Sequence, residues 1–218
     1  MFDRYKLIGR FYDFMSRAYS GNAILNCKLA MLRADTLTSG SKVLFAGAGH
    51  GRDAIKAAEL GAHVTMLDIS PTMMSKFEQH LSTHPRYNEL RVELVLGDIL
   101  KHEKFEHYDM VVANFFLNVF DKKTMDHLLN HLIKLCCSKG KVVIGDFSPP
   151  NGGFIQRILQ QIYWYSAAIA FCAFAGNAIH RIYNYREILE KKGLVTLDHQ
   201  FFPLFGKNFF HSILAEKP

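Results

Sequence analysis

The sequence predicts an α/β fold with helices on both faces of a sheet, and three observations lead to this prediction. Short apolar runs suited to strands alternate with longer segments whose apolar residues recur at helical spacing. The strand-like runs end in glycine, aspartate or asparagine, as strands do where they meet a turn. Two further strand-like runs close the chain without a helix between them, which indicates a C-terminal antiparallel hairpin.

The first predicted strand leads into a glycine-rich turn. Lys42–Ala46 is short, apolar and able to form a strand, and glycines follow it at every second position. From Arg52 to Leu60 the apolar residues recur near helical spacing, and Gly61 stands where a helix C-cap would lie. Because glycines let the backbone approach a ligand closely, and a helix N-terminus favours a negative group, this turn is a candidate binding site.

A second strand follows, and its last residue is acidic. His63–Leu67 is apolar and ends at Asp68, about 20 residues after the glycines, the separation used for a ribose-binding acid in nucleotide-binding βαβ units. The glycines follow the pattern G-x-G-x-G, which matches neither the phosphate-binding loop with its lysine nor the dinucleotide pattern G-x-G-x-x-G. The stretch therefore favours a nucleoside ligand without a phosphate chain.

Two later strands also bring polar residues to the predicted ligand-binding edge. Ser70-Pro71 predicts the start of a helix, and Leu90–Leu96 predicts a third strand that ends in Gly97-Asp98-Ile99. Phe105–Asn114 predicts the fourth strand, so that Asn114 to Asn118 lie at the edge where such sheets bind ligands.

The next elements complete the sheet and place another carboxylate at its edge. Asp121–Leu135 predicts an amphipathic helix, and Ser138–Lys141 predicts a turn. Val142–Phe147 predicts the fifth strand, with Asp146 near a substrate. Near the C-terminus, Tyr185–Lys192 predicts the last helix, before the hairpin strands Leu194–Phe202 and Phe209–Glu216.

Two segments lie outside this regular pattern. Residues 1–37 look helical, with a break near residues 20–22. Residues 148–182 form an apolar insertion that is expected to be helical from Phe154 to Ile182, and its uncharged part, Tyr163–Gly176, is shorter than the roughly 20 residues that a bilayer span needs. The insertion is either a substrate cap or membrane-surface contact, with Trp164 on its exposed face, or a core helix buried all round.

Composition predicts one domain over residues 1–218 in a reducing compartment. Aromatic residues make up 13% of the chain and include 18 Phe, a surplus that would suit a lipophilic site. The net charge is +6 but the basic residues are scattered, so nucleic acid is not predicted, and attraction to an acidic membrane surface stays open. The four cysteines form no C-x-x-C pair, so no metal site is expected, and without a secretory signal the predicted location is cytoplasmic or at the membrane surface.

From Lys42 to Asp146 these motifs resemble class I S-adenosylmethionine-dependent methyltransferases, in particular those that modify quinones and lipids. The resemblance implies a Rossmann-like seven-stranded sheet and S-adenosyl-L-methionine as cofactor. It also implies that Asp68 holds the ribose hydroxyls and that Asp98 accepts a hydrogen bond from the adenine amino group, whereas a helix-capping role is the alternative for Asp98. Asn114 would meet the amino-acid end of the cofactor or the substrate, or else satisfy backbone groups.

The residues expected to form the site follow from the turn, the strand ends and this resemblance. The segment from Phe11 to Tyr19 is similar to the N-terminal lid of methyltransferases related to ubiquinone and phospholipid synthesis. No catalytic residue is predicted, because positioning and desolvation supply most of the rate of methyl transfer. The predicted cofactor-binding residues are Ala46, Gly47, Ala48, Gly49, Gly51, Asp68, Ile69, Asp98, Ile99 and Asn114, and the predicted substrate-binding residues are Tyr12, Tyr19, Asn118, Asp146 and Trp164.

One residue departs from the family pattern. The family usually carries an acid two residues before the first glycine, and Phe45 stands at that position. The expected function is methyl transfer to a lipophilic small molecule such as a quinone precursor, a lipid or an aromatic compound. The departure keeps open a rhodoquinone-type enzyme that transfers a group other than methyl. A non-catalytic cofactor-binding or regulatory module of the same fold is a second alternative.

Overall fold

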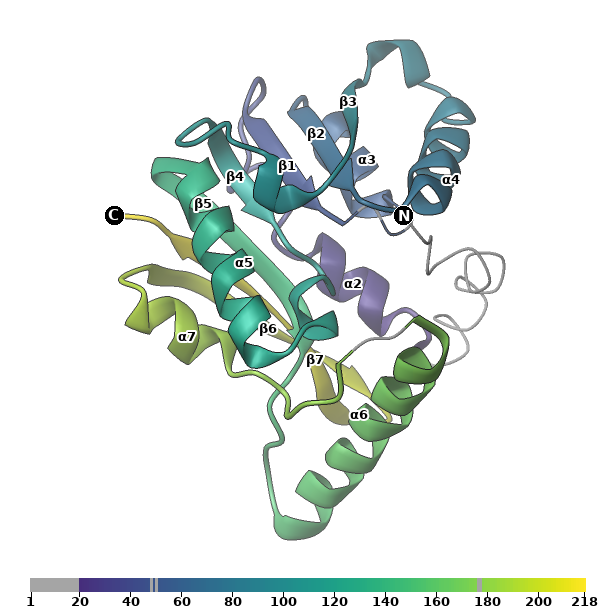
Figure 1. Cartoon of the computed structure of the whole chain (residues 1–218), viewed down its shortest axis with the longest axis vertical. Coiled ribbons are helices and arrows are strands. Elements are labelled where there is room, and N and C mark those ends of the chain that lie inside the picture. Colours follow the sequence, from purple (N-terminus) through teal and green to yellow (C-terminus); the bar gives the residue numbers. More distant parts are fainter. Residues whose placement is uncertain (1–19, 48, 50, 176–177) are drawn as a thin grey trace.

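A seven-stranded sheet forms the centre of the molecule (Figure 1). The structure is a computed structural model, and it describes residues 20–47, 49, 51–175 and 178–218. The strand order is β3-β2-β1-β4-β5-β7-β6, in which β7 runs antiparallel to both of its neighbours. The strands are β1 (Lys42–Ala46), β2 (His63–Asp68), β3 (Arg91–Leu96), β4 (Tyr108–Val112), β5 (Cys136–Phe147), β6 (Val195–Leu204) and β7 (Lys207–Glu216).

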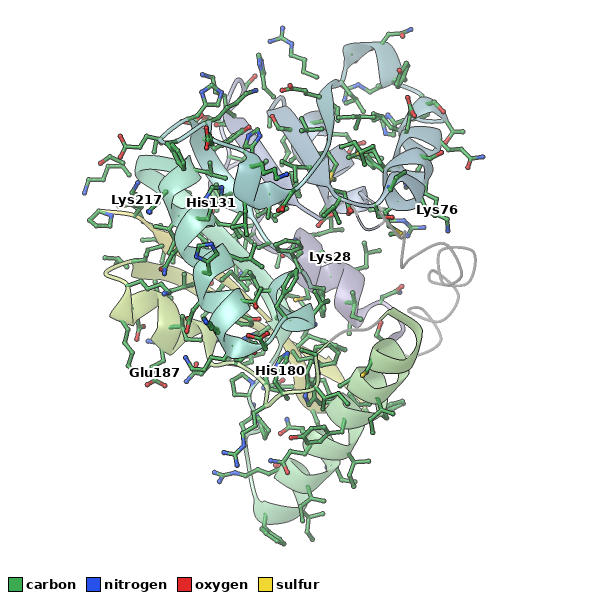
Figure 2. All side chains as sticks on the ribbon, in the orientation of Figure 1. Lys28, Lys76, His131, His180, Glu187 and Lys217 are labelled. Carbon is green, nitrogen blue, oxygen red and sulfur yellow. The ribbon has the colours of Figure 1, made fainter. Side chains whose placement is uncertain are left out.

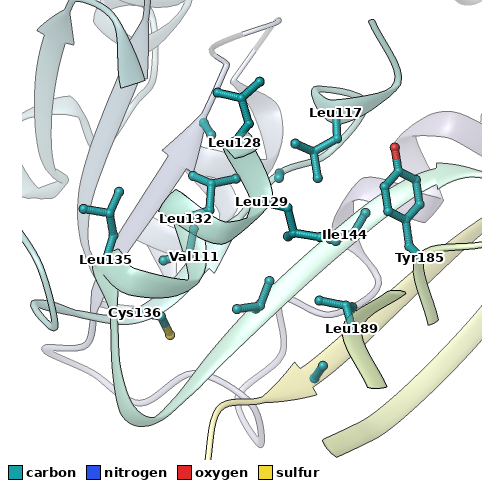
Figure 3. Packing of buried hydrophobic residues seen from close by; sticks show 14 of the residues in the cluster. Val111, Leu117, Leu128, Leu129, Leu132, Leu135, Cys136, Ile144, Tyr185 and Leu189 are labelled. Carbon is teal, nitrogen blue, oxygen red and sulfur yellow. The ribbon is translucent and has the colours of Figure 1, made fainter. Parts of the chain in front are cut away.

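Helices cover both faces of the sheet, as the sequence predicted. One buried cluster joins α3 and α4 to one face, and a second joins α5 and α7 to the other (Figure 3). Successive strand residues alternate between these clusters: Val43 and Phe45 belong to the first, Leu44 and Ala46 to the second. The helices are α2 (Ala23–Leu29), α3 (Arg52–Glu59), α4 (Pro71–Ser82), α5 (Lys122–Leu135), α6 (Phe154–Ala175) and α7 (Tyr185–Lys191), with 3₁₀ turns η1 (Tyr87–Glu89), η2 (Ile99–Lys101) and η3 (Leu117–Val119).

Local signals in the sequence set several of these boundaries. The Ser70 hydroxyl accepts a hydrogen bond from the Met73 N–H and Pro71 occupies the first position of α4, so this helix begins where the sequence indicated. In the terminal hairpin, Phe205 and Gly206 both have positive φ, 50° and 72°, the backbone of a tight two-residue turn.

Three boundaries differ from the prediction. The helix before the first strand ends at Leu29 rather than near residue 37, because the Thr36 hydroxyl bonds the backbone of Met31 and Arg33 and competes with helical hydrogen bonds. The predicted turn Ser138–Lys141 lies within β5 as an irregularity, since the register with β4 shifts between Tyr108 and Met110.

The third difference concerns the insertion. Its helix ends at Ala175, and residues 178–184 are irregular. These residues form hydrogen bonds to the segment around η3: the Ala178 N–H donates to the Val119 carbonyl, and the Tyr183 hydroxyl donates to the Phe120 carbonyl. Within the described residues, no helix is both long and apolar enough to cross a membrane.

The strand order locates the functional edge. β1 lies between β2 and β4. From β1 the chain adds β2 and then β3 on one side, and β4 and the later strands follow on the other side of β1. In open α/β sheets the ligand binds in the crevice at such a reversal of strand order. The residues after β1, β2, β4 and β5 therefore define the candidate site.

Candidate active site

The glycine turn after β1 has the backbone that its sequence suggested. Gly49 has φ +48°, and a Cβ built on it would lie 3.3 Å from the Lys28 Nζ atom. Gly51 has φ +63°, and its Cβ would lie 1.9 Å from the Phe77 ring. Gly51 is thus required by the packing of α4 against the turn, whereas Gly49 meets only the end of a flexible side chain. Ala46 and Gly47 are described beside them, and Ala48 and His50 lie outside the described residues.

Asp68 lies at the carboxyl end of β2, next to this turn. Its Oδ1 atom accepts a hydrogen bond of 2.7 Å from the Ser70 N–H, and the Gly47 N–H donates to the Leu67 carbonyl. The side chain of Ile69 is 43% exposed although it is large and apolar. A carboxylate and an exposed apolar side chain thus stand together at the sheet edge, where a sugar and a flat ring could bind.

Asp98 and Ile99 follow β3 with different surroundings. The Asp98 Oδ1 atom accepts a hydrogen bond of 3.0 Å from the Leu100 N–H and caps η2, which is the alternative role considered for it. Ile99 is 5% exposed and packs in the core cluster, so its side chain does not face the edge. Contact of either residue with adenine stays a prediction.

Asn114 links three elements behind the turn. Its Nδ2 atom donates to the Asp53 Oδ2 atom at 3.0 Å and to the Lys28 carbonyl at 3.2 Å. Its buried Oδ1 atom makes no hydrogen bond with the described part of the chain. Asn114 thus satisfies a backbone carbonyl and positions a buried carboxylate, Asp53, in the first turn of α3, and its contact with the cofactor or the substrate stays a prediction.

Lys28 and Asp53 lie beside the glycine turn, and the sequence did not point to either of them. Lys28 comes from α2, and its side chain reaches towards the glycine turn and lies 5.8 Å from the centre of the Phe115 ring (Figure 2). A lysine in a short helix far upstream of the glycines carries no local signal. Together the two residues supply one cation and one anion near the turn, which would suit a zwitterionic ligand.

Three of the predicted substrate residues meet in one pocket. Asn118 from η3, Asp146 from β5 and Trp164 from α6 line it, together with aromatic side chains from residues 178–185. The Asn118 Oδ1, Asp146 Oδ2 and Tyr185 hydroxyl atoms are buried and make no hydrogen bond within the described residues. Buried polar atoms are nearly always paired, so such a group indicates a missing polar ligand. Tyr12 and Tyr19 lie outside the described residues.

The ionisation of Asp146 reflects its burial. Burial raises the pKa of Asp146 to about 7, against the lowering effect of the Phe147 N–H and the nearby Tyr185 and Asn118 side chains. Burial, and then the charge of Asp146, raise the pKa of Tyr185 well above its ordinary value. Figure 3 shows the Tyr185 ring at the margin of the leucine cluster, with its hydroxyl directed away from Leu189. The pocket therefore holds a carboxyl group that changes charge near neutral pH.

Trp164 closes the pocket from the side of α6. The sequence placed it on the exposed face of the insertion, and this expectation is wrong: Trp164 is 4% exposed and its ring lies 4.6 Å from the Phe147 ring. Its indole N–H donates to the His180 carbonyl at 3.0 Å, and a His180 ring nitrogen lies 2.9 Å from the Asn118 carbonyl. In this conformation the pocket has no room for a water molecule, so a ligand could enter only if α6 or residues 178–184 moved.

No group of three or more His, Cys, Asp or Glu side chains in the described ranges could hold a metal ion. The Cys27 thiol is buried and lies 3.1 Å from the His211 carbonyl, to which it donates. Burial, and next the Asp146 charge, raise the pKa of Cys27 well above its ordinary value, so this thiol is not set up as a nucleophile.

Comparisons with known proteins agree with this geometry. Residues 44–142 match a family model described as a methyltransferase domain. Ribosomal RNA small subunit methyltransferase J of Psychrobacter arcticus is 36% identical over 84 residues, which cover 36% of this chain but only 28% of that relative.

Solved structures share the fold over most of the chain. Magnesium protoporphyrin IX methyltransferase from Synechocystis, with bound S-adenosylhomocysteine, has a TM-score of 0.68 at 20% identity and covers 89% of this chain and 83% of its own. A 1,6-didemethyltoxoflavin-N1-methyltransferase from Burkholderia thailandensis has a TM-score of 0.68 at 18% identity, covering 98% and 86%. Residues 44–142 therefore match a methyltransferase domain, and the chain has the fold of class I S-adenosylmethionine-dependent methyltransferases.

Proposed function

We propose that this chain transfers a methyl group from S-adenosyl-L-methionine to a lipophilic small molecule bound under α6. The observation that carries the proposal is the pocket at the ends of β4 and β5. There, aromatic side chains surround three neighbouring buried polar atoms that make no hydrogen bond in the described part of the chain, Asn118 Oδ1, Asp146 Oδ2 and the Tyr185 hydroxyl. Mostly apolar walls with a few placed polar groups are typical of small-molecule sites.

The residues around the glycine turn suit the cofactor. The turn offers backbone near Gly49, and among the described residues the Lys28 ammonium lies over it, which is suited to a carboxylate. The Asp53 carboxylate, buried against Asn114, would take the ammonium of the same amino-acid end and compensate for the acid that Phe45 replaces. Asp68 and the exposed Ile69 would hold the ribose and adenine. When bound, S-adenosylmethionine would supply a methyl group already activated by its sulfonium centre.

The pocket residues would orient the acceptor and manage its proton. The aromatic walls exclude water, which strengthens polar contacts inside the pocket. A hydroxyl or amino group of the substrate could donate to Asp146 Oδ2, and a carboxylate with a pKa of about 7 is suited to take up that proton near neutral pH. The Tyr185 hydroxyl and the side-chain oxygen Oδ1 of Asn118 would fix the polar end of the substrate.

The function is tested with isotope-labelled cofactor. Purified chain is incubated with S-adenosylmethionine labelled in the methyl group and a total lipid and quinone extract, and label is measured in the organic phase. We expect label there, and the mass of the product should exceed that of its precursor by one methylene. Binding of S-adenosylhomocysteine without any labelled product would instead favour the non-catalytic module.

Two other products are distinguished by the same experiment. A product whose added mass is not that of a methylene would indicate the rhodoquinone-type reaction. The similarity to a ribosomal RNA methyltransferase makes RNA the second candidate acceptor, so ribosomal RNA is incubated in parallel. Label confined to RNA would contradict the lipophilic substrate while leaving the methyltransferase assignment intact.

A further inference from the structure

The outward side of α6 is apolar, the reverse of an ordinary surface helix. Ile155, Ile158, Ile162 and Ile169 are 72%, 38%, 60% and 58% exposed. Their spacing of three, four and seven residues places them on one face. A soluble helix normally turns this face to the core and its polar face to water. Figure 1 shows the first turns of α6 projecting beyond the sheet.

The opposite face of α6 already has its packing partners. Gln160, Trp164 and Ala168 recur every fourth residue and are buried against β5 and β7. The Gln160 amide donates to the Asn208 carbonyl at 3.0 Å and accepts from the Asn151 N–H at 2.8 Å. The orientation of the helix is thus fixed by core contacts, and the isoleucine face is left pointing outwards.

Further apolar side chains extend this face. Phe154, at the start of the helix, is 79% exposed, and Leu159 is 44% exposed. Phe205, at the tip of the hairpin next to α6, is 84% exposed. Exposed apolar groups that gather in this way mark an interaction surface. We define the α6 surface as Phe154, Ile155, Ile158, Leu159, Ile162 and Ile169.

Helix α6 carries basic but no acidic charge. Its one charged residue is Arg157, and Arg181 is the next charged residue along the chain. The second half of the hairpin region, from residue 199 to residue 215, likewise has no acid and contains Lys207. The partner of this surface is therefore expected to be apolar and negatively charged. A second copy of the chain would bring like charges together, which disfavours a symmetric dimer through α6.

We propose that α6 docks on the surface of an anionic lipid bilayer, lying in the interfacial plane with its isoleucine face among the acyl chains. A helix with an apolar face and with basic but no acidic residues is suited to bind in this plane. The described helices do not cross the membrane. This docking would place Trp164 and the pocket directly behind the membrane-bound face, so that a lipophilic ligand could enter from the bilayer. The binding itself does not depend on the reaction proposed above.

Vesicle sedimentation tests this proposal in the absence of any cofactor. The full chain is mixed with vesicles of phosphatidylcholine containing phosphatidylglycerol, and with vesicles of phosphatidylcholine alone. We expect sedimentation with the anionic vesicles, weaker sedimentation at high salt because the arginine contribution is screened, and much less with the neutral vesicles.

Paired variants distinguish binding through the α6 surface from non-specific adsorption to vesicles. The double variant Ile155→Ser, Ile162→Ser removes two outward side chains and should weaken binding to anionic vesicles roughly tenfold or more. The matched control Val195→Ser, Leu197→Ser removes two side chains that are 58% and 49% exposed on the edge strand β6, and it should bind like the wild type. Thermal melting checks that both variants are folded, as expected for exposed sites.

Three outcomes would overturn the proposal. If the wild-type chain sediments with neither kind of vesicle, the α6 surface is not a membrane contact. Undiminished binding of the Ile155→Ser, Ile162→Ser variant would place the contact elsewhere. A wild-type dimer that this variant converts to a monomer, with no vesicle binding, would identify a second copy as the partner. None of these results bears on methyl transfer, which is measured separately as label passed from the cofactor to the lipid and quinone extract or to RNA.

Discussion

Asp146 and His211 lie directly opposite each other on the antiparallel strands β5 and β7, and both are buried to within 1% of full burial. Burial shifts each towards its neutral form. The pKa of Asp146 is raised to about 7, and the pKa of His211 is lowered to about 3 by burial and then by the neighbouring His199, whose ring nitrogen lies 3.0 Å away. Asp146 therefore binds its proton more tightly in the folded state than in the unfolded state, and His211 binds its proton less tightly.

These opposite shifts predict how stability depends on pH. Asp146 keeps its proton in the folded protein between its unfolded value of 3.8 and about 7, so its contribution to stability falls as the pH rises through that window. His211 stays neutral when folded but is protonated when unfolded below 6.5, so its contribution rises with pH from about 3 to 6.5. The two effects have opposite signs, so they should oppose each other in the wild type between about pH 4 and pH 6.5.

Removing Asp146 should expose the histidine effect. In Asp146→Asn the free energy of unfolding, from urea titrations at pH 4 to 8, should rise steeply up to about pH 6.5 and then level off. At pH 8 this variant should exceed the wild type in stability, because the buried charge is gone while an amide oxygen can still accept from the Phe147 N–H. A flat profile in the variant would show that His211 titrates normally in the folded state.

The cofactor proposal predicts a clear effect of Asp68→Ala. Losing charge-assisted hydrogen bonds to the ribose removes about 1.5 to 3 kcal/mol, so calorimetry should show S-adenosylhomocysteine bound roughly tenfold or more weakly. The control Asp126→Ala, which removes a partly exposed carboxylate on α5 that pairs with Lys122 and Lys192, should bind normally. Unchanged affinity in Asp68→Ala would remove this residue from the site.

Lys28 is expected to act only on the amino-acid end of the cofactor. Lys28→Ala should weaken S-adenosylhomocysteine binding about tenfold, by the loss of one charged contact, but leave binding of 5′-methylthioadenosine unchanged, since that ligand has no carboxylate. Asp68→Ala should weaken both ligands, which share the ribose. An equal loss of affinity for both ligands in Lys28→Ala would indicate that the lysine stabilises the glycine turn and does not bind the carboxylate of the cofactor.

Gly49→Val should abolish S-adenosylhomocysteine binding and leave a folded domain. A β-branched side chain is penalised at the positive φ of this residue and would occupy the space between the turn and Lys28. Gly51→Val should instead destabilise the fold, because its side chain would overlap the Phe77 ring. Melting curves together with calorimetry separate the two effects, and full affinity in Gly49→Val would count against this turn as the cofactor cradle.

Tyr185→Phe tests the substrate pocket with little structural cost. The hydroxyl is buried without a partner among the described residues, so its removal should change the free energy of unfolding by no more than about 1 kcal/mol. If the hydroxyl holds the substrate, KM should rise while affinity for S-adenosylhomocysteine stays constant. Trp164→Ser is a poorer probe, because truncating this buried aromatic should cost about 3 to 5 kcal/mol and lower activity through unfolding.

The sequence by itself determined the sheet, its order of elements and the cofactor edge. Alternating apolar periods, the glycines after Ala46, the serine and proline before α4 and the spacing to Asp68 are local signals, because strands, caps and turns depend on residues close in the chain. It also found Asn118 and Asp146 as separate candidates, since each follows a strand that ends at the same edge.

Only the tertiary structure decided what these residues face. The contact between Lys28 and the glycine turn, the bond between Asn114 and Asp53, and the pairing of Asp146 with His211 join segments far apart in the chain, so no local pattern encodes them. The same holds for α6: its composition allowed a buried helix, a cap or a membrane contact. The packing of Gln160, Trp164 and Ala168 against β5 and β7 fixed its rotation, and that rotation turned Trp164 inwards and the isoleucines outwards.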